Sequence, residues 1–147
     1  PILRDLAMLK AAVKNPWLAK IDGARPITVE AASNLAYKTP ELRAKPGEKL
    51  ALTFVNPDVV PHNWVLVKPG TLATVGTLAD ALIADPEAVA RHYVPKTVDV
   101  VAYADITSPG ARQTIFFTVP AAPGRYPFLC TFPGHWKLMN GVLVVGE

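Results

Sequence analysis

The chain has 147 residues, of which 50% are apolar and 18% are charged. This is the composition of one globular domain with a sizeable core, and it excludes a disordered or fibrous protein. The net charge of +3 comes from the N-terminal third, because residues 1–49 hold nine Lys or Arg against five Asp or Glu, whereas residues 50–147 hold six against seven. No basic cluster is interleaved with stacking aromatic residues, so we expect no nucleic-acid partner.

The first 26 residues differ in pattern from the rest of the chain. Residues 1–14 carry apolar side chains at near-helical spacing and predict a short amphipathic helix, which is followed by a linker up to residue 26. This helix either docks on the main domain, residues 27–147, or belongs to the end of a preceding module. No apolar run reaches the ~18 residues of a transmembrane helix, and the chain opens with Pro1, so we expect a processed chain or one excised from a larger protein.

From residue 27 onward, short runs rich in β-branched and aromatic residues alternate with Pro-Gly turns. Fifteen prolines suit such strands and turns better than a helical bundle. The predicted strands cover residues 27–30, 41–44, 49–55, 63–68, 98–104, 113–119, 125–130 and 142–145. We therefore expect an all-β Greek-key β-sandwich of about eight strands.

One stretch, near residues 71–97, departs from the strand pattern. Residues 77–84 and 86–92 have a helical pattern, with Asp85 as an N-cap and Pro86 at the first helical position. We expect a helical insertion between two strands. His92 ends the second predicted helix, where a cation is favourable, and is interpreted as structural.

The single cysteine stands in a loop that also holds a histidine and a methionine. Cys130, His135 and Met139 lie just before the last predicted strand. A thiolate, two imidazoles and a weak axial thioether are the donors of blue copper sites. His62, at the start of a strand that is distant in sequence but near in a sandwich, is the candidate for the second imidazole. The sequence thus predicts one copper ion bound by these four residues.

Other classes of protein use similar residues. A Cys/His hydrolase would pair Cys130 with His135, but it leaves His62 and Met139 without a role. A copper chaperone or storage protein stays open as an alternative, although such proteins exchange metal through exposed sulfur and Cys130 ends a predicted core strand. Three histidines are too few for the trinuclear cluster of a multicopper oxidase. Zinc fits the same donors and would be an artefact of preparation.

The segment 130–139, paired with the sequence that starts at His62, resembles the copper-binding pattern of the azurin and auracyanin branch of the cupredoxins. The resemblance spans about residues 27–145 and implies an eight-stranded Greek-key sandwich with a helical flap at residues 71–97. It also implies a type 1 copper electron carrier that cycles between Cu(I) and Cu(II) and is not an enzyme.

The resemblance further assigns the surroundings of the metal. It implies that Asn63 ties the two ligand loops together through the backbone at Thr131, and that the N–H groups of Asn63 and Phe132 donate to the Cys130 sulfur. Pro61 stands where azurin has a glycine whose carbonyl approaches copper, so the proline is expected to alter that approach. We also expect apolar residues to keep water off the metal, among them Trp64, Phe128, Phe132 and Leu138.

The resemblance implies that the protein functions in the periplasm or otherwise outside the cytoplasm. The expected partners are redox proteins such as a cytochrome or a dehydrogenase module, one of which would be attached if the chain is excised from a larger redox protein. We expect docking near His135 and Trp136, where Pro61, Phe132 and Pro133 would form an apolar rim around the histidine.

Overall fold

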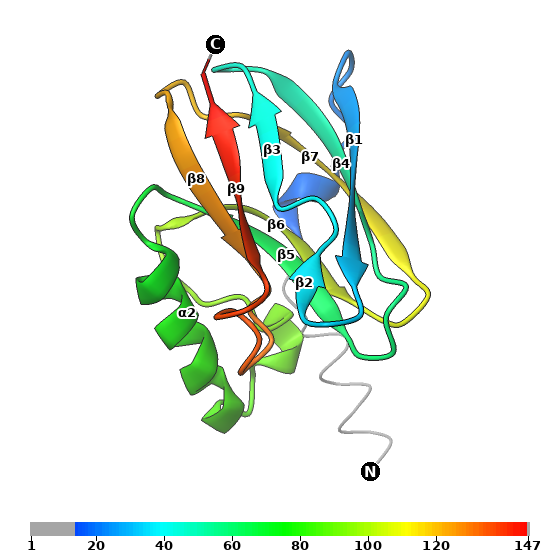
Figure 1. Ribbon diagram of the computed structural model, residues 1–147, viewed down its shortest axis with the longest axis vertical. Helices are drawn as coiled ribbons and strands as arrows, with labels where there is room; N and C mark the ends of the chain where they lie inside the picture. Colours follow the sequence, from blue (N-terminus) through cyan, green and yellow to red (C-terminus); the bar gives the residue numbers. More distant parts are fainter. Residues whose placement is uncertain (1–13, 147) are drawn as a thin grey trace.

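Two β-sheets pack face to face in the computed structural model, which describes residues 14–146 (Figure 1). The first sheet has the order β2-β1-β4-β7, formed by β2 (Ala36–Tyr37), β1 (Arg25–Ala32), β4 (Lys49–Val55) and β7 (Arg112–Thr118). The second sheet has the order β3-β9-β8-β5-β6, formed by β3 (Glu41–Ala44), β9 (Asn140–Val145), β8 (Gly124–Leu129), β5 (His62–Val67) and β6 (Val100–Thr107). The expected β-sandwich is confirmed. The helix predicted over residues 1–14 falls almost wholly outside the described residues.

The alternating apolar pattern places the core between the sheets. In β4, Leu50, Leu52 and Phe54 are buried while the residues between them are partly exposed, as expected for a strand with one face on the core. They face Trp64 of β5 and Phe128 of β8 in one continuous cluster of buried side chains. The two-residue strand β2 has no counterpart in the prediction, because two residues are too short to show an alternating pattern.

Strand β5 is buried on both faces, which explains its uninterrupted run of apolar residues after His62. Trp64 and Leu66 belong to the core between the sheets, whereas Val65 and Val67 point to the opposite face and join a second buried cluster with Val75. Val75 lies in α2 (Leu72–Ala81), which runs beside β5 and β8 (Figure 1). The insertion therefore covers the outer face of the second sheet.

The helical insertion is confirmed, but its predicted boundaries are wrong. Helix α2 begins five residues before the predicted residue 77 and continues into the 3-10 turn η2 (Leu82–Ala84). Thr, Val and Gly in its first turns are weak helix formers, and burial of Val75, Gly76 and Ala79 outweighs that preference. The second predicted helix is only the 3-10 turn η3 (Val89–Arg91), because His92 and Tyr93 adopt left-handed backbone conformations that end it.

Part of the segment interpreted as a linker packs on β6. The buried side chain of Asn15 donates to the carbonyl of Tyr103 at 2.9 Å and to the Asp105 carboxylate at 3.0 Å. Trp17, in the 3-10 turn η1 (Pro16–Leu18), packs edge-on against the Tyr103 ring, with 5.1 Å between centroids. Among the helices of residues 14–146, none has the length and hydropathy that a bilayer crossing requires.

A substitution at Gly76 tests how closely α2 packs on the loop that follows β8. A Cβ at Gly76 would lie 2.2–2.5 Å from ring atoms of Trp136, so Gly76→Ala forces the ring away. We expect a loss of roughly 1–3 kcal/mol of unfolding free energy from overpacking, although alanine is the better helix former by about 1 kcal/mol. Urea denaturation measures the change. Thr77→Ala, at an exposed position of the same helix, is the control and should change stability by less than about 0.5 kcal/mol. A Gly76→Ala protein as stable as the wild type would contradict this packing.

Candidate metal centre

The antiparallel pairing of β5 with β8 brings two distant parts of the chain to one end of the sandwich. Val65 pairs with Leu129 and Leu66 with Phe128, so the start of β5 lies beside the end of β8. His62 is the first residue of β5, and Cys130 directly follows β8. The loop from Cys130 to β9 is closed by a hydrogen bond from the Cys130 N–H to the Met139 carbonyl at 3.1 Å.

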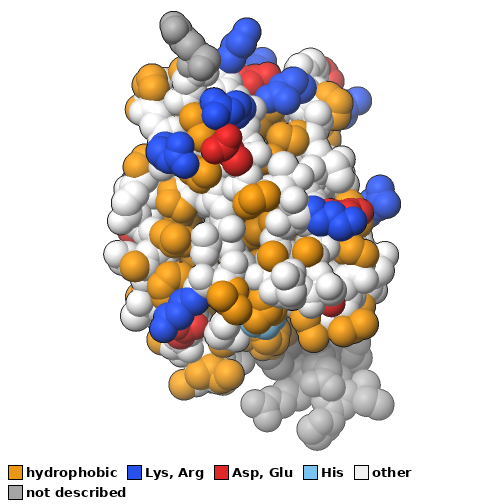
Figure 2. Space-filling model, viewed as in Figure 1, with side chains coloured by type: hydrophobic (Ala, Val, Ile, Leu, Met, Phe, Trp, Pro, Cys, Tyr) orange, Lys and Arg blue, Asp and Glu red, His pale blue; other side chains and the backbone are white. Residues whose placement is uncertain are grey.

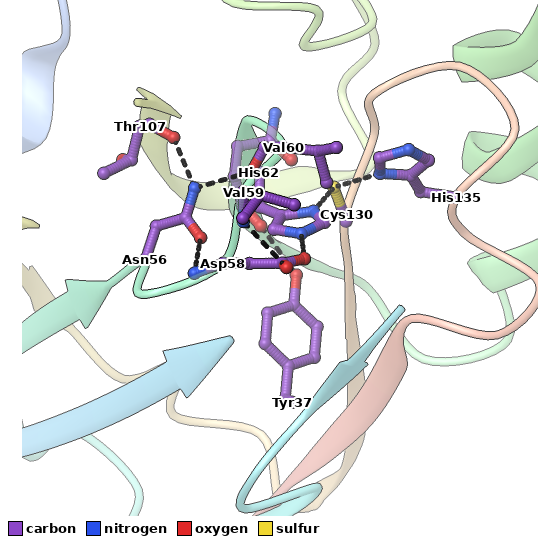
Figure 3. A network of polar contacts seen from close by, with 10 residues as sticks. Tyr37, Asn56, Asp58, Val59, Val60, His62, Thr107, Cys130 and His135 are labelled. Atoms are coloured by element: carbon purple, nitrogen blue, oxygen red, sulfur yellow. Dashed lines mark hydrogen bonds and ion pairs between the residues drawn. The ribbon is translucent and has the colours of Figure 1, made fainter. Parts of the chain in front are cut away.

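Three of the predicted ligands converge at this end. The Nδ1 atoms of His62 and His135 lie 3.7 and 3.6 Å from the sulfur of Cys130 (Figure 3). All three donor atoms lie within 4.8 Å of one another. The two imidazole rings are 5.1 Å apart between centroids and tilted by 55°. One sulfur and two nitrogen donors thus face a common point.

The Cys130 thiol is fully buried, and its pKa is raised to about 11. Burial is the main cause, because the apolar surroundings disfavour a thiolate. The backbone N–H groups of Asn63 and Phe132 point at the sulfur and partly oppose this effect. A buried thiol with a raised pKa is a poor nucleophile, which argues against the hydrolase interpretation.

The two histidines have different surroundings. The His62 ring is fully buried, and its Nε2 lies 2.7 Å from a carboxylate oxygen of Asp58 (Figure 3). This hydrogen bond, together with the N–H of Val59, holds the pKa of Asp58 below its ordinary value. His135 is partly buried and packs against the Phe132 ring at 4.9 Å. Burial lowers the pKa of His135, and the neighbouring His62 adds to the effect, so the His135 imidazole is neutral at pH 7 and able to bind a metal.

Asn63 links the two loops that carry the histidines. Its side-chain oxygen accepts from the Thr131 N–H at 2.8 Å, and its amide donates to the Thr131 hydroxyl at 2.7 Å and to the His92 carbonyl at 3.0 Å. The carbonyl of Asn63 accepts from the buried hydroxyl of Tyr37 at 2.7 Å. Burial raises the pKa of Tyr37 well above its ordinary value, so this hydroxyl remains a donor. Nothing in the sequence pattern identifies Tyr37, because its role depends on the short strand β2.

The remaining residues of the predicted site lie beside this group. Met139 is fully buried, and its N–H donates to the carbonyl of His135 at 2.9 Å. Pro61 is partly exposed just before His62. Leu138 was expected to shield the site, but its side chain is 70% exposed and that expectation is wrong. The loop turns at Leu138 so that Met139, not Leu138, faces the core.

The ligand loop is also fastened to α2. Asp80 accepts from the Trp136 indole N–H at 2.8 Å and from the Gly134 N–H at 3.0 Å. The Trp136 ring lies over Gly76, and its side chain is only partly exposed. Trp136 therefore anchors the loop to the helical insertion as well as lying next to His135. Nothing in the spacing of Asp80 and Trp136, 56 residues apart, indicates this contact.

The donor set fits a soft or borderline metal ion. Cysteine sulfur and two imidazole nitrogens are donors that copper and zinc accept, and a thioether alongside them favours copper. The cluster is held by main-chain and side-chain hydrogen bonds of its own, with an apolar core behind it. This arrangement places three donor atoms that suit such a metal around one point at the end of the sandwich.

Comparison with known proteins gives the same result. The profile of the family described as copper binding proteins, plastocyanin/azurin family, matches residues 25–146. Auracyanin-A of Chloroflexus aurantiacus is 35% identical over 128 residues, which are 84% of this chain and 76% of that protein. Its solved structure matches with a TM-score of 0.75 at 33% identity, over 84% of this chain and 100% of that one. A solved auracyanin from Roseiflexus castenholzii matches with a TM-score of 0.72 at 35% identity, over 85% of this chain and 100% of that one. This chain belongs to the plastocyanin/azurin family of copper-binding proteins.

Proposed function

We propose that this protein carries single electrons on one type 1 copper ion bound by His62, Cys130, His135 and Met139. The observation that supports this proposal is the convergence of three donor atoms, two imidazole nitrogens and one sulfur, within 4.8 Å. When bound, copper supplies a centre that alternates between Cu(I) and Cu(II) and so accepts or gives one electron at a time. Held by these four residues, the ion would have no free position for a substrate, and we assign no catalytic activity.

The protein contributes a fixed set of donors. The hydrogen bonds of Asn63 to Thr131 hold the two loops at one spacing, so little has to move when the charge of the site changes. The N–H groups of Asn63 and Phe132 withdraw electron density from the Cys130 sulfur. Because the pKa of the thiol is about 11 without a metal, Cys130 keeps its proton at neutral pH and must release it when it binds a cation.

The chaperone or storage interpretation fits the site less well. Metal exchange between proteins needs sulfur atoms that a partner can reach, and both Cys130 and Met139 have no exposed surface. A rigid, closed site favours electron transfer over release of the ion.

We propose that this protein functions in the periplasm or otherwise outside the cytoplasm. Its partner would be a redox protein such as a cytochrome or a dehydrogenase module. The partner would dock near His135 and Trp136. Figure 2 shows hydrophobic side chains around a histidine at the lower end of one face, while most Lys and Arg side chains lie toward the upper end. Val59, three residues before His62, and Leu138, in the loop that holds His135, are 86% and 70% exposed. A small apolar surface of this kind suits a weak electron-transfer contact.

Cys130→Ser tests the thiolate ligand. Copper(II) loading of the wild type should give an intense visible absorption band and a reversible one-electron couple, and the serine variant should lose the band because a hydroxyl is a poor soft donor. Uptake at pH 8 should release about one proton from the wild type and none from the variant. Circular dichroism checks that the variant is folded. A folded variant that remains blue would contradict the assignment of Cys130.

The thioether of Met139 would be a weak ligand of the copper ion and would adjust its reduction potential. Met139→Gln places a harder oxygen donor that favours Cu(II) and lowers the potential, whereas Met139→Leu removes the donor and raises it. We expect a shift of ~59 mV or more in each direction, which is a tenfold change in relative affinity for the two oxidation states. Cyclic voltammetry measures both. Equal potentials in all three proteins would assign Met139 to core packing alone.

Leu138→Gln tests the docking surface without disturbing the contact of Trp136 with α2. The substitution removes apolar surface beside His135, so bimolecular electron transfer to a cytochrome should slow several-fold at an unchanged potential. Val98→Gln is the matched control: Val98 is 82% exposed but precedes β6 at the other end of the sandwich. Equal rates for both variants, measured by stopped-flow absorption, would show that docking occurs elsewhere.

A further inference from the structure

Asp58 contacts the His62 ring on the side that faces away from Cys130. Its Oδ2 lies 2.7 Å from Nε2 of the ring, while Nδ1 of the same ring faces the sulfur of Cys130 at 3.7 Å (Figure 3). The His62 side chain is 0% exposed and the Asp58 side chain 7% exposed, so water does not compete freely for this contact. Both ring nitrogens are therefore committed, one to a carboxylate and the other to the donor cluster.

The carboxylate determines which nitrogen of His62 carries the proton. An ionised carboxylate only accepts hydrogen bonds, so the proton of a neutral ring must reside on Nε2. The lone pair of Nδ1 then points toward the Cys130 sulfur, in the direction that a metal ligand requires. A carboxylate behind a ligand histidine fixes the tautomer and orientation of the ring and makes it a stronger base.

Asp58 is itself held in place by its neighbours. Its second oxygen accepts from the Val59 N–H at 2.8 Å, and its own N–H donates to the side-chain oxygen of Asn56 at 3.0 Å. The amide of Asn56 donates to the carbonyls of Val60 and Thr107, at 2.9 and 2.8 Å. Asn56 is fully buried and thus ties the Asp58 loop to β6. The carboxylate is a fixed part of the fold and not a mobile surface group.

Within residues 14–146, the other imidazole has no such partner. The His135 ring makes its polar contact with the Cys130 sulfur and otherwise packs against Phe132. The carboxylate thus hydrogen-bonds one histidine, on the buried side of the cluster, and reaches His135 only through space. A negative charge one ring away from a metal stabilises the more highly charged oxidation state.

We propose that Asp58 is a positioning residue that fixes His62 as the Nε2–H tautomer and lowers the reduction potential of the copper site. This inference rests on the proposed function, because it concerns the same metal site. In the metal-free protein, the carboxylate of Asp58 alone sets the tautomer of His62.

The test compares two variants that each remove one negative charge. Asp58→Asn keeps a side-chain oxygen that accepts from Nε2–H but loses the negative charge. Asp99→Asn is the control and removes the same charge at the opposite end of β5. Its position there is shown by the Asp99 carbonyl, which accepts from the N–H of Lys68. The six residues of β5 span about 20 Å, beyond the screening length of ~8 Å at physiological salt. Voltammetry at that ionic strength should show a tenfold or larger loss of Cu(II) preference in Asp58→Asn, a rise of ~59 mV or more, and less than a twofold change in Asp99→Asn.

Nitrogen-15 NMR of the copper-free protein provides a readout that needs no metal. The wild type should show His62 protonated at Nε2, Asp58→Asn should keep that tautomer, and Asp58→Leu should lose it. A wild-type ring protonated at Nδ1, or a potential that moves equally in Asp58→Asn and Asp99→Asn, would overturn the inference. Failure of the proposed function is a separate outcome, since it would show as a copper-loaded wild type without the visible band. The wild-type NMR result decides the tautomer even if a variant does not fold.

Discussion

The side chain of Asn63 is the constraint on which the metal centre depends. Its amide joins Thr131 and the His92 carbonyl, its backbone carbonyl accepts from Tyr37, and its N–H points at the Cys130 sulfur. The contacts with Thr131 and Tyr37 are buried, so loss of the amide would leave buried polar atoms of Thr131 unpaired at a cost of about 1–3 kcal/mol each. One residue thus sets the spacing of the ligand loops, the position of the helical insertion and the electron density on the sulfur.

Burial and charge act in opposite directions around this residue. The apolar core keeps the Cys130 thiol neutral, and burial disfavours the charged form of His135, so neither donor places an uncompensated charge in the core. The one carboxylate in the group, that of Asp58, lies on the far side of the His62 ring. The fold can therefore assemble the donor cluster before any ion is present, because the cluster does not need a metal to neutralise it.

The sequence predicted the features that depend on residue type and short-range pattern. Cys130, His135 and Met139 were recognisable because few residue types bind soft metals. The strands of the sandwich were recognisable because apolar and polar residues alternate along a strand that has one buried face. Features that depend on packing were not predictable. The start of α2 is set by burial of Val75 against β5, which overrides weak helix propensity. Aspartate is common in turns, and Asp58 lies in a short segment between two prolines. Nothing in the sequence therefore distinguished a residue that contacts His62 from an ordinary turn residue.

The parallel pairing of β3 with β9 has a consequence for how the protein reaches its fold. Glu41 pairs with Val142 and Ala44 with Val145, so β9 fills the gap between β3 and β8. Contacts between residues that are about a hundred positions apart close slowly, because a long loop must be ordered first. Until residues 140–145 have emerged from the ribosome, β3 and β8 each present an unpaired edge to other chains. The nascent chain is therefore most prone to aggregation in the interval after β8 has emerged and before residues 140–145 follow it.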